Sequence, residues 1–284
     1  MLWHTSDRST NYPGRLAKRL LAIAAPVLTS TAIASAPAYG ATFAASHSEF
    51  YFDNFSHSPT SSHTFAGTDT WTWAKPAGSV AAVGNAEAVF FHPPNYPAVA
   101  WNESSSLAFG EGHDYRGFAA SEARVIGNFF IPEAEDFYFD FSGGLQLATS
   151  IENSPGEAAK AAADISFLLL DRSQPENQQL LDFVSLSAAL ETDLDTDFIG
   201  YQNSPTVTAN FSSHTEFGGL QEFAGIGVEG SVKRSFNSPT HLSLVELKNT
   251  RVAVKAPEPS LTLGFMVLGL LGIRLKSQTT KENN

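Results

Sequence analysis

Apolar and polar residues alternate along much of the chain, and this alternation predicts short β-strands rather than helices. It is clearest where aromatic residues occupy every second position, as in residues 50–52, 70–73 and 137–141. A period of two places alternate side chains on opposite faces of a strand, whereas a helix repeats every 3.6 residues. The same pattern predicts further strands at residues 124–130, 164–171, 180–190, 206–211, 223–232, 241–248 and 251–255.

Glycine, proline and asparagine predict where these strands end. Gly143 and Gly144 separate the aromatic run from the apolar run at 145–149, which predicts a β-hairpin with a glycine turn. Asn249 and Thr250 separate the last two predicted strands. Residues 157–163 are rich in alanine and fit either a helix or a strand.

Many short strands with turn signals between them predict an all-β fold. We expect a single β-sandwich or jelly-roll-like domain over residues 41–255. No shift in composition marks a second domain in the 284 residues. The chain contains no cysteine, which excludes disulfides and thiolate metal sites.

The N-terminal 40 residues have the features of a secretory signal peptide. Arg15, Lys18 and Arg19 precede an apolar stretch at 20–33, and small residues follow up to Gly40. Basic residues, an apolar stretch and a small-residue site are the three parts of such a signal. We therefore expect export, with cleavage after Ala38 or Gly40, of which we favour Gly40. The alternative is an anchor that is not cleaved.

The C-terminal end has three parts in a fixed order: Pro257-Glu258-Pro259, an uncharged apolar run, and Arg274 with Lys276. At about 1.5 Å per residue the apolar run covers roughly 20 Å, short of the roughly 30 Å hydrocarbon core of a bilayer. Long basic side chains can reach the headgroups and make up part of the difference. We expect a transmembrane helix over residues 260–273, with the C-terminus on the cytoplasmic side.

This tripartite pattern resembles the PEP-CTERM sorting signal of bacterial surface proteins. The resemblance covers residues 256–276, and residues 277–284 form a polar tail that is longer than usual in that family. It implies recognition by exosortase, a membrane protease, with transient anchoring and cleavage near Pro-Glu-Pro. It also implies release or attachment at the cell surface, often in bacteria that produce exopolysaccharide.

The expected mature chain is strongly acidic. Residues 41–259 contain ten Lys and Arg against 27 Asp and Glu, a net charge of about −17. Such a charge opposes nucleic acid and anionic polysaccharide as partners, and leaves cations and neutral glycans.

Two groups of residues are candidates for binding. Asp193, Asp195 and Asp197 alternate as at the start of a calcium loop, but Phe198 stands where the turn glycine belongs. They form either an acidic loop or a weak Ca²⁺ site, and we predict no other cofactor. Trp71, Trp73 and Trp101 are candidates for stacking on sugar rings, although Trp71 and Trp73 share one strand face, which also fits core packing.

The sequence contains no G-x-S-x-G elbow, P-loop or dinucleotide fingerprint, and we predict no catalytic residue. We therefore expect a non-enzymatic surface or matrix protein associated with exopolysaccharide. The alternatives are a lectin-like glycan-binding sandwich and a carbohydrate-active enzyme. The enzyme would need two buried carboxylates in a cleft.

Overall fold

The computed structural model describes residues 41–94, 96–154, 156–192, 194 and 196–257. The predicted signal peptide (1–40) and transmembrane helix (260–273) lie outside this range. The described residues include no helix with the length and apolar character needed to span a membrane.

The described part of the chain forms twelve strands, and every pair of neighbours is antiparallel. The strands are β1 (Ala41–Asp53), β2 (Ser61–Ala74), β3 (Gly78–Phe91), β4 (Val99–Gly112), β5 (Tyr115–Ile131), β6 (Glu135–Ser150), β7 (Ala158–Asp171), β8 (Gln179–Glu191), β9 (Phe198–Asn203), β10 (Thr208–Glu216), β11 (Gln221–Phe236) and β12 (Thr240–Ala256).

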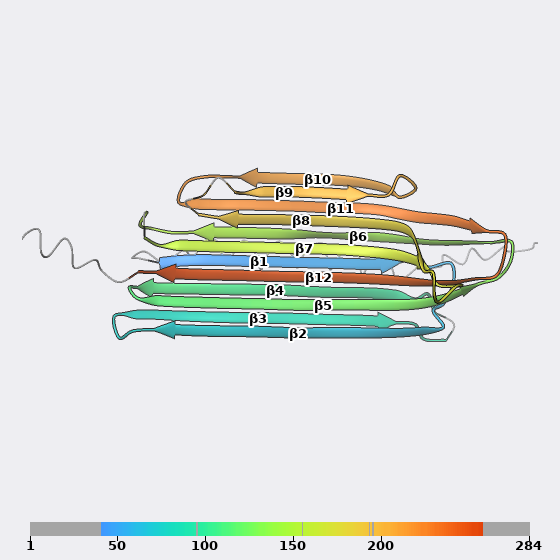
Figure 1. Cartoon of the computed structure of the whole chain (residues 1–284), viewed down its shortest axis with the longest axis horizontal. Coiled ribbons are helices and arrows are strands. Elements are labelled where there is room, and N and C mark those ends of the chain that lie inside the picture. Colours follow the sequence, from blue (N-terminus) through green and yellow to red (C-terminus); the bar gives the residue numbers. More distant parts are fainter. Residues whose placement is uncertain (1–40, 95, 155, 193, 195, 258–284) are drawn as a thin grey trace, which may run out of the picture. The chain divides into compact units, whose positions relative to one another are not determined.

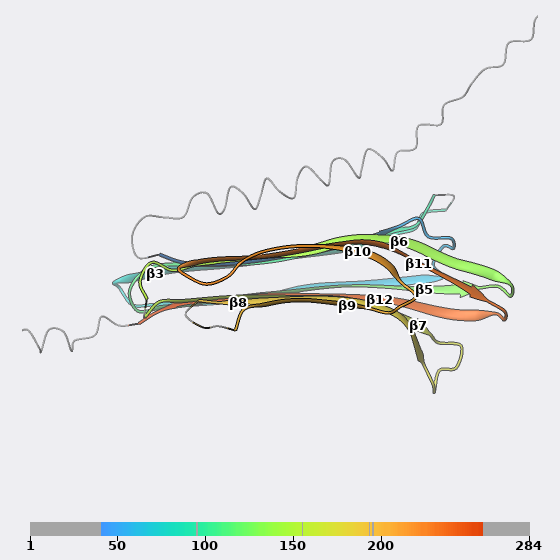
Figure 2. The ribbon, with the colours of Figure 1, turned by 90° about the horizontal axis from the view of Figure 1, so that it is seen from above.

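These strands form two six-stranded sheets that pack face to face, as Figures 1 and 2 show. The first sheet has the order β10-β11-β6-β1-β4-β3, and the second has β2-β5-β12-β7-β8-β9. The predicted all-β fold with two antiparallel layers is therefore confirmed. One side of the sandwich is bounded by β3 and β2, and the other by β10 and β9.

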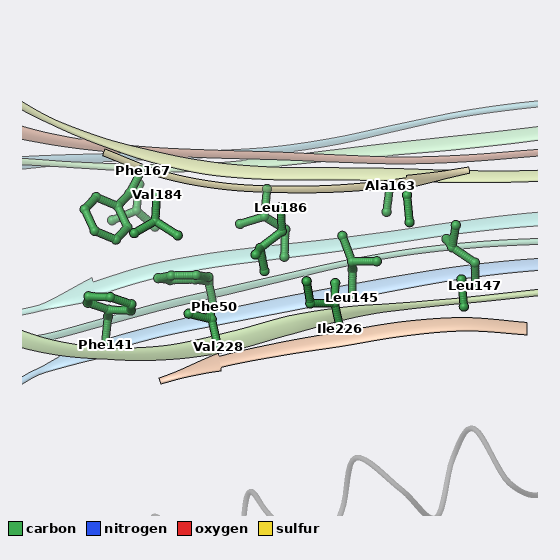
Figure 3. Close-up of a cluster of buried hydrophobic side chains, with 14 of the residues drawn as sticks. Phe50, Phe141, Leu145, Leu147, Ala163, Phe167, Val184, Leu186, Ile226 and Val228 are labelled. Carbon is green, nitrogen blue, oxygen red and sulfur yellow. The ribbon is translucent and has the colours of Figure 1, made fainter. Parts of the chain in front are cut away.

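The core lies between the sheets and follows the period of two. Buried and partly exposed residues alternate along β1, β5, β7 and β12. Phenylalanines from both sheets meet in the core, and the ring centroid of Phe167 on β7 lies 5.0 Å from that of Phe141 and 5.9 Å from that of Phe50. Figure 3 shows Phe50, Phe141 and Phe167 pointing into the same interior layer.

The predicted hairpin at Gly143 and Gly144 is wrong, because β6 runs through both glycines without a turn. A Cβ at Gly143 would lie 2.3 Å from the Phe50 ring, and one at Gly144 would lie 2.6 Å from the Ile226 carbonyl oxygen. The two glycines let neighbouring strands and a core ring approach the backbone closely.

Two further boundaries differ from the sequence prediction. Asn249 and Thr250 lie within the continuous strand β12, and Thr250 is buried. The ambiguous alanine-rich segment belongs almost entirely to β7, which begins at Ala158. Its alternate alanines, Ala159, Ala161 and Ala163, are buried against the other sheet.

Candidate functional site

Three large aromatic side chains are exposed on the outer face of β2. Phe65, Trp71 and Trp73 keep 46%, 52% and 45% of their surface accessible. We call these three residues the β2 aromatic strip. The alternative prediction that Trp71 and Trp73 pack in the core is wrong.

The pairing of β2 with β5 explains why the strip faces solvent. Trp71 lies opposite Phe118 and Phe65 lies opposite Arg124, whereas the inward residues of β5, such as Ala119 and Val125, are buried. Residues on one strand that are two apart share a face and are about 7 Å apart. The two tryptophans therefore lie side by side on the outer face of β2.

Charged side chains border the strip. The Arg124 guanidinium carbon lies 5.4 Å from the centre of the Phe65 ring, a cation–π arrangement. A nitrogen of the same guanidinium lies 3.7 Å from a Glu122 carboxylate oxygen. Trp73 lies opposite Arg116. The strip thus combines aromatic faces with polar groups that can bind hydroxyls.

The third predicted tryptophan is not part of this surface. Trp101 lies on β4 in the other sheet, opposite Tyr51 and Val89, between the inward residues Ala100 and Asn102. The Trp101 side chain therefore points to the outer face of the first sheet, whereas Trp71 and Trp73 lie on the outer face of the second sheet. The structure brings Trp71 and Trp73 together and separates Trp101 from them.

The predicted acidic loop joins β8 to β9, and β9 is the edge strand of the second sheet opposite to β2. Asp193 and Asp195 lie outside the described residues, and Asp197 accepts a hydrogen bond from the Glu191 N–H at 2.8 Å. In the part of the chain that the structure describes, no three His, Asp or Glu side chains are grouped as metal ligands would be.

Sequence reasoning missed the partner of Asp197, which is Glu222 at the start of β11. The Glu222 carboxylate is buried and accepts a hydrogen bond of 2.8 Å from the Thr149 hydroxyl. Burial, followed by the nearby negative charge of Asp197, raises the pKa of Glu222. A carboxylate from the β8–β9 loop and one from β11 therefore lie close together, and no sequence spacing connects them.

Sequence reasoning also missed a fully buried ion pair in the middle of the sandwich. The Lys248 ammonium lies 3.6 Å from a Glu246 carboxylate oxygen and donates to the Asn102 carbonyl at 2.8 Å. The Asn102 side-chain amide donates to the other oxygen of Glu246. Burial raises the pKa of Glu246 to about 7 and lowers the pKa of Lys248 to about 8.

Buried hydroxyls continue this polar layer along the interior. Thr250 on β12 shares hydrogen bonds with the hydroxyls of Ser104 at 2.8 Å and Ser106 at 3.0 Å, both on β4. The Ser104 hydroxyl also donates to the Ser121 carbonyl at 3.0 Å. The layer connects the two sheets and is closed to solvent, so we assign it to structure.

The buried carboxylate of Asp182 is paired with an arginine from the other sheet. Arg234 on β11 donates from Nε to Asp182 on β8 at 2.5 Å, and the Ser204 and Thr206 hydroxyls also donate to Asp182. Burial acts to raise the pKa of Asp182, but these hydrogen bonds hold it below its ordinary value. Glu157 likewise accepts the N–H groups of Glu152 and Asn153 at 2.9 and 3.0 Å.

The predicted sorting motif follows directly after the last strand of the sandwich. β12 stops at Ala256, and Pro257 follows it, exposed, with its carbonyl accepting the Asp114 N–H at 3.3 Å. Glu258, Pro259, Arg274 and Lys276 lie outside the described residues. Among the described residues, the last buried core residue is Ala256, directly before the predicted motif.

Comparison with protein-family models, curated proteins and solved structures finds no match to this chain.

Proposed function

We propose that this chain is an exported, non-enzymatic surface protein whose sandwich binds neutral extracellular polysaccharide through the β2 aromatic strip. The observation that carries the binding role is the exposure of Trp71 and Trp73 on one strand face, each about half accessible. Exposed aromatic groups of this size usually mark a contact surface rather than a random surface position. The acidic charge favours a neutral glycan over an anionic one.

The export part of the proposal rests on the two ends of the chain. Residues 1–40 act as a signal peptide, and residues 256–276 act as the sorting signal that exosortase cleaves. The helix at 260–273 holds the protein in the membrane until cleavage, after which the sandwich is released or attached outside the cell. Nucleic acid is not a partner in this proposal, because the acidic charge of residues 41–259 opposes it. The weak Ca²⁺ site predicted at Asp193, Asp195 and Asp197 lies partly outside the described residues and has no role in the proposal.

The enzyme alternative receives less support from the positions of the acidic groups. Four carboxylates are buried among the described residues, those of Glu157, Asp182, Glu222 and Glu246. Each has hydrogen-bond or ionic partners within the protein. Glu222 on β11 lies near the partly exposed Asp197, which is in the loop between β8 and β9. Both lie toward the edge of the sandwich opposite to the aromatic strip.

The binding role is tested with the full chain in mild detergent and polysaccharide extracted from the producing cells. We expect Trp71→Ala/Trp73→Ala to weaken binding about tenfold or more, which is about 1.4 kcal/mol. Trp101→Ala is the matched control, since it removes the same side chain from the opposite face. Equal binding by the wild type and the double variant, or an equal loss in the control, would contradict the proposal.

A further inference from the structure

The two strands at one side of the sandwich are long and unprotected. β2 and β3 each have 14 residues, whereas β9 and β10 at the other side have 6 and 9. Neither β2 nor β3 contains Lys, Arg or Pro, and each has one acidic residue, Asp69 and Glu87. Natural sheets usually protect their edges with short strands, lysines, prolines or bulges.

Both strands also keep a regular register along their whole length. β2 pairs with β5, and β3 pairs with β4, without a bulge. Among the described residues, no strand pairs with the outer side of either one. Two adjacent rows of backbone N–H and C=O groups are therefore available to another chain.

We propose that this side binds a second copy of the chain, with β2 pairing antiparallel to the partner's β2 and β3 to the partner's β3. The two copies are related by a two-fold axis perpendicular to the sheets. A Cβ at Gly84 would lie 3.1 Å from the Thr68 Cβ, so these residues face one another across the sandwich. One axis near Thr68 and Gly84 can therefore serve both pairs of strands, and self-complementary surfaces of this kind are typical of symmetric dimers.

The outward-facing residues of β2 favour pairing in this register over its neighbours. With the axis at Thr68, Phe65 lies opposite the partner's Trp71, and Gly67 lies opposite the partner's Asp69. Aromatic pairs directly opposite one another favour pairing, whereas like charges oppose it, and Gly67 opposite Asp69 avoids such a clash. Moving the axis to Asp69 would place two aspartates opposite each other.

The inward residues of β2 agree with the same register. Thr64 lies opposite the partner's Thr72, and Thr68 lies opposite the partner's Thr68. Cross-strand threonine pairs are favourable neighbours in antiparallel sheets.

The pairing of β3 with the partner's β3 is compatible with the same two-fold axis. With the axis at Gly84, Glu87 lies opposite the partner's Ala81, and Ala82 lies opposite the partner's Ala86. Glu87 thus faces a small uncharged residue, and Ala82 faces another alanine, so two copies can approach closely without facing like charges.

The size of this surface suits a stable dimer. The two strands supply 28 residues from each copy, within the range of about 20–30 residues per partner in a standard interface. Pairing would also place the aromatic strips of the two copies next to each other. The inference does not rest on polysaccharide binding, because it follows from the strand edges and not from the tryptophans.

Because the chain has no cysteine, single cysteines can test the register directly. Thr68→Cys places two thiols opposite each other at an antiparallel Cα separation of about 4.5–5.5 Å, within disulfide range. In Thr64→Cys or Thr72→Cys alone, the two thiols of a dimer would be about 27 Å apart. The double variant Thr64→Cys/Thr72→Cys brings them together again.

The full chain in mild detergent is oxidised and separated by non-reducing electrophoresis. We expect a cross-linked dimer from Thr68→Cys and from the double variant, with at least tenfold less from either single control. Absence of cross-linking in Thr68→Cys, or equal cross-linking at all positions, would overturn the proposal. A monomer, or the chain paired to a different protein, would overturn it as well.

A disruptive variant gives a second measurement. Thr70→Lys places a charge on the inner side of the β2 edge, opposite the buried Ala119 of β5. Thr215→Lys is the matched control, since Thr215 lies on the inner side of the β10 edge, opposite the buried Ala224 of β11. By sedimentation velocity, we expect a dimer for the wild type and the control and a monomer for Thr70→Lys, with an unchanged circular dichroism spectrum. A dimer that survives Thr70→Lys in the folded protein would contradict the proposed interface.

Discussion

Glu246 and Lys248 lie two residues apart on β12, and both side chains are fully buried. Removing two charges from water costs several kcal/mol per ion, and their attraction repays this only with good geometry. Here the ammonium lies 3.6 Å from one carboxylate oxygen, and that oxygen and the Asn102 Oδ1 have no hydrogen-bond partner among the described residues. The pair is therefore a weak source of stability and a strong source of pH dependence.

The direction of that pH dependence follows from the two pKa values. The folded chain keeps the Glu246 proton up to about pH 7, whereas the unfolded chain loses it near its ordinary value of 4.5, so stability falls as pH rises through this range. Lys248 loses its proton in the folded chain near pH 8 but near 10.5 in the unfolded chain, so stability rises again with pH through that range. The contribution of the pair is lowest between about pH 7 and 8.

We predict that Glu246→Gln/Lys248→Met removes this minimum while keeping an acceptor for the Asn102 amide. The free energy of unfolding, measured in urea at about pH 5, 7.5 and 9.5, should vary less in the double variant than in the wild type. Lys248→Met alone should lose about 3 kcal/mol near neutral pH, because it leaves the carboxylate unpaired. Identical pH profiles for the wild type and the double variant would show that the pair does not titrate as described.

At the scale of the strand, glycines that resemble turn signals act as spacers. Gly143 and Gly144 lie in the middle of β6, where β1 and β11 pass on either side. A short apolar run on each side of a Gly-Gly pair has the same sequence pattern as a hairpin. Whether the chain turns depends on neighbours that are far away in sequence, such as Phe50 and Ile226.

A substitution that adds one methyl group at Gly143 tests whether this residue is closely packed within β6. We predict that Gly143→Ala destabilises the fold by about 1–3 kcal/mol, because the new Cβ overlaps the Phe50 ring and the Glu49 carbonyl. Gly200→Ala on β9 is the control, since its Cβ would meet only the Ser187 hydroxyl, at an ordinary 3.7 Å. Urea midpoints compare the two, and a loss in Gly143→Ala no larger than in the control would contradict close packing at β6.

The alternation of apolar and polar residues predicted strands correctly where the inward side chains are large and apolar. It located β6, β7, β8, β11 and β12 at least in part, because their inward positions hold Phe, Leu, Ile and Val. β4 escaped prediction because its inward positions include Asn102, Ser104 and Ser106, which belong to the buried polar layer. β3 escaped it because its inward residues are mostly small.

The candidate site could be predicted only in part for a similar reason. The sequence shows that Trp71 and Trp73 share a face, but not that this face belongs to an edge strand and points outward. It also cannot show that Trp101 lies on the other sheet. Both facts depend on the order β2-β5-β12 and β1-β4-β3, which joins strands that are far apart in the chain.

At the scale of the whole molecule, the sandwich and the proposed targeting signals occupy separate stretches of the chain. The buried core residues of the described part all lie between Ala41 and Ala256. The described strands run from Ala41, the first residue that the structure describes, to Ala256, directly before Pro257. Removal of both ends would leave the described core intact.

We propose that the chain is exported and processed at both ends, and the mass of the mature protein is a direct test of this processing. The protein is recovered from the surface and medium of the producing cells, and its intact mass and terminal peptides are measured by mass spectrometry. We predict a chain that begins at Ala41 and ends between Pro257 and Pro259. A chain recovered from the cytoplasm with Met1 and Asn284 both present would contradict the account.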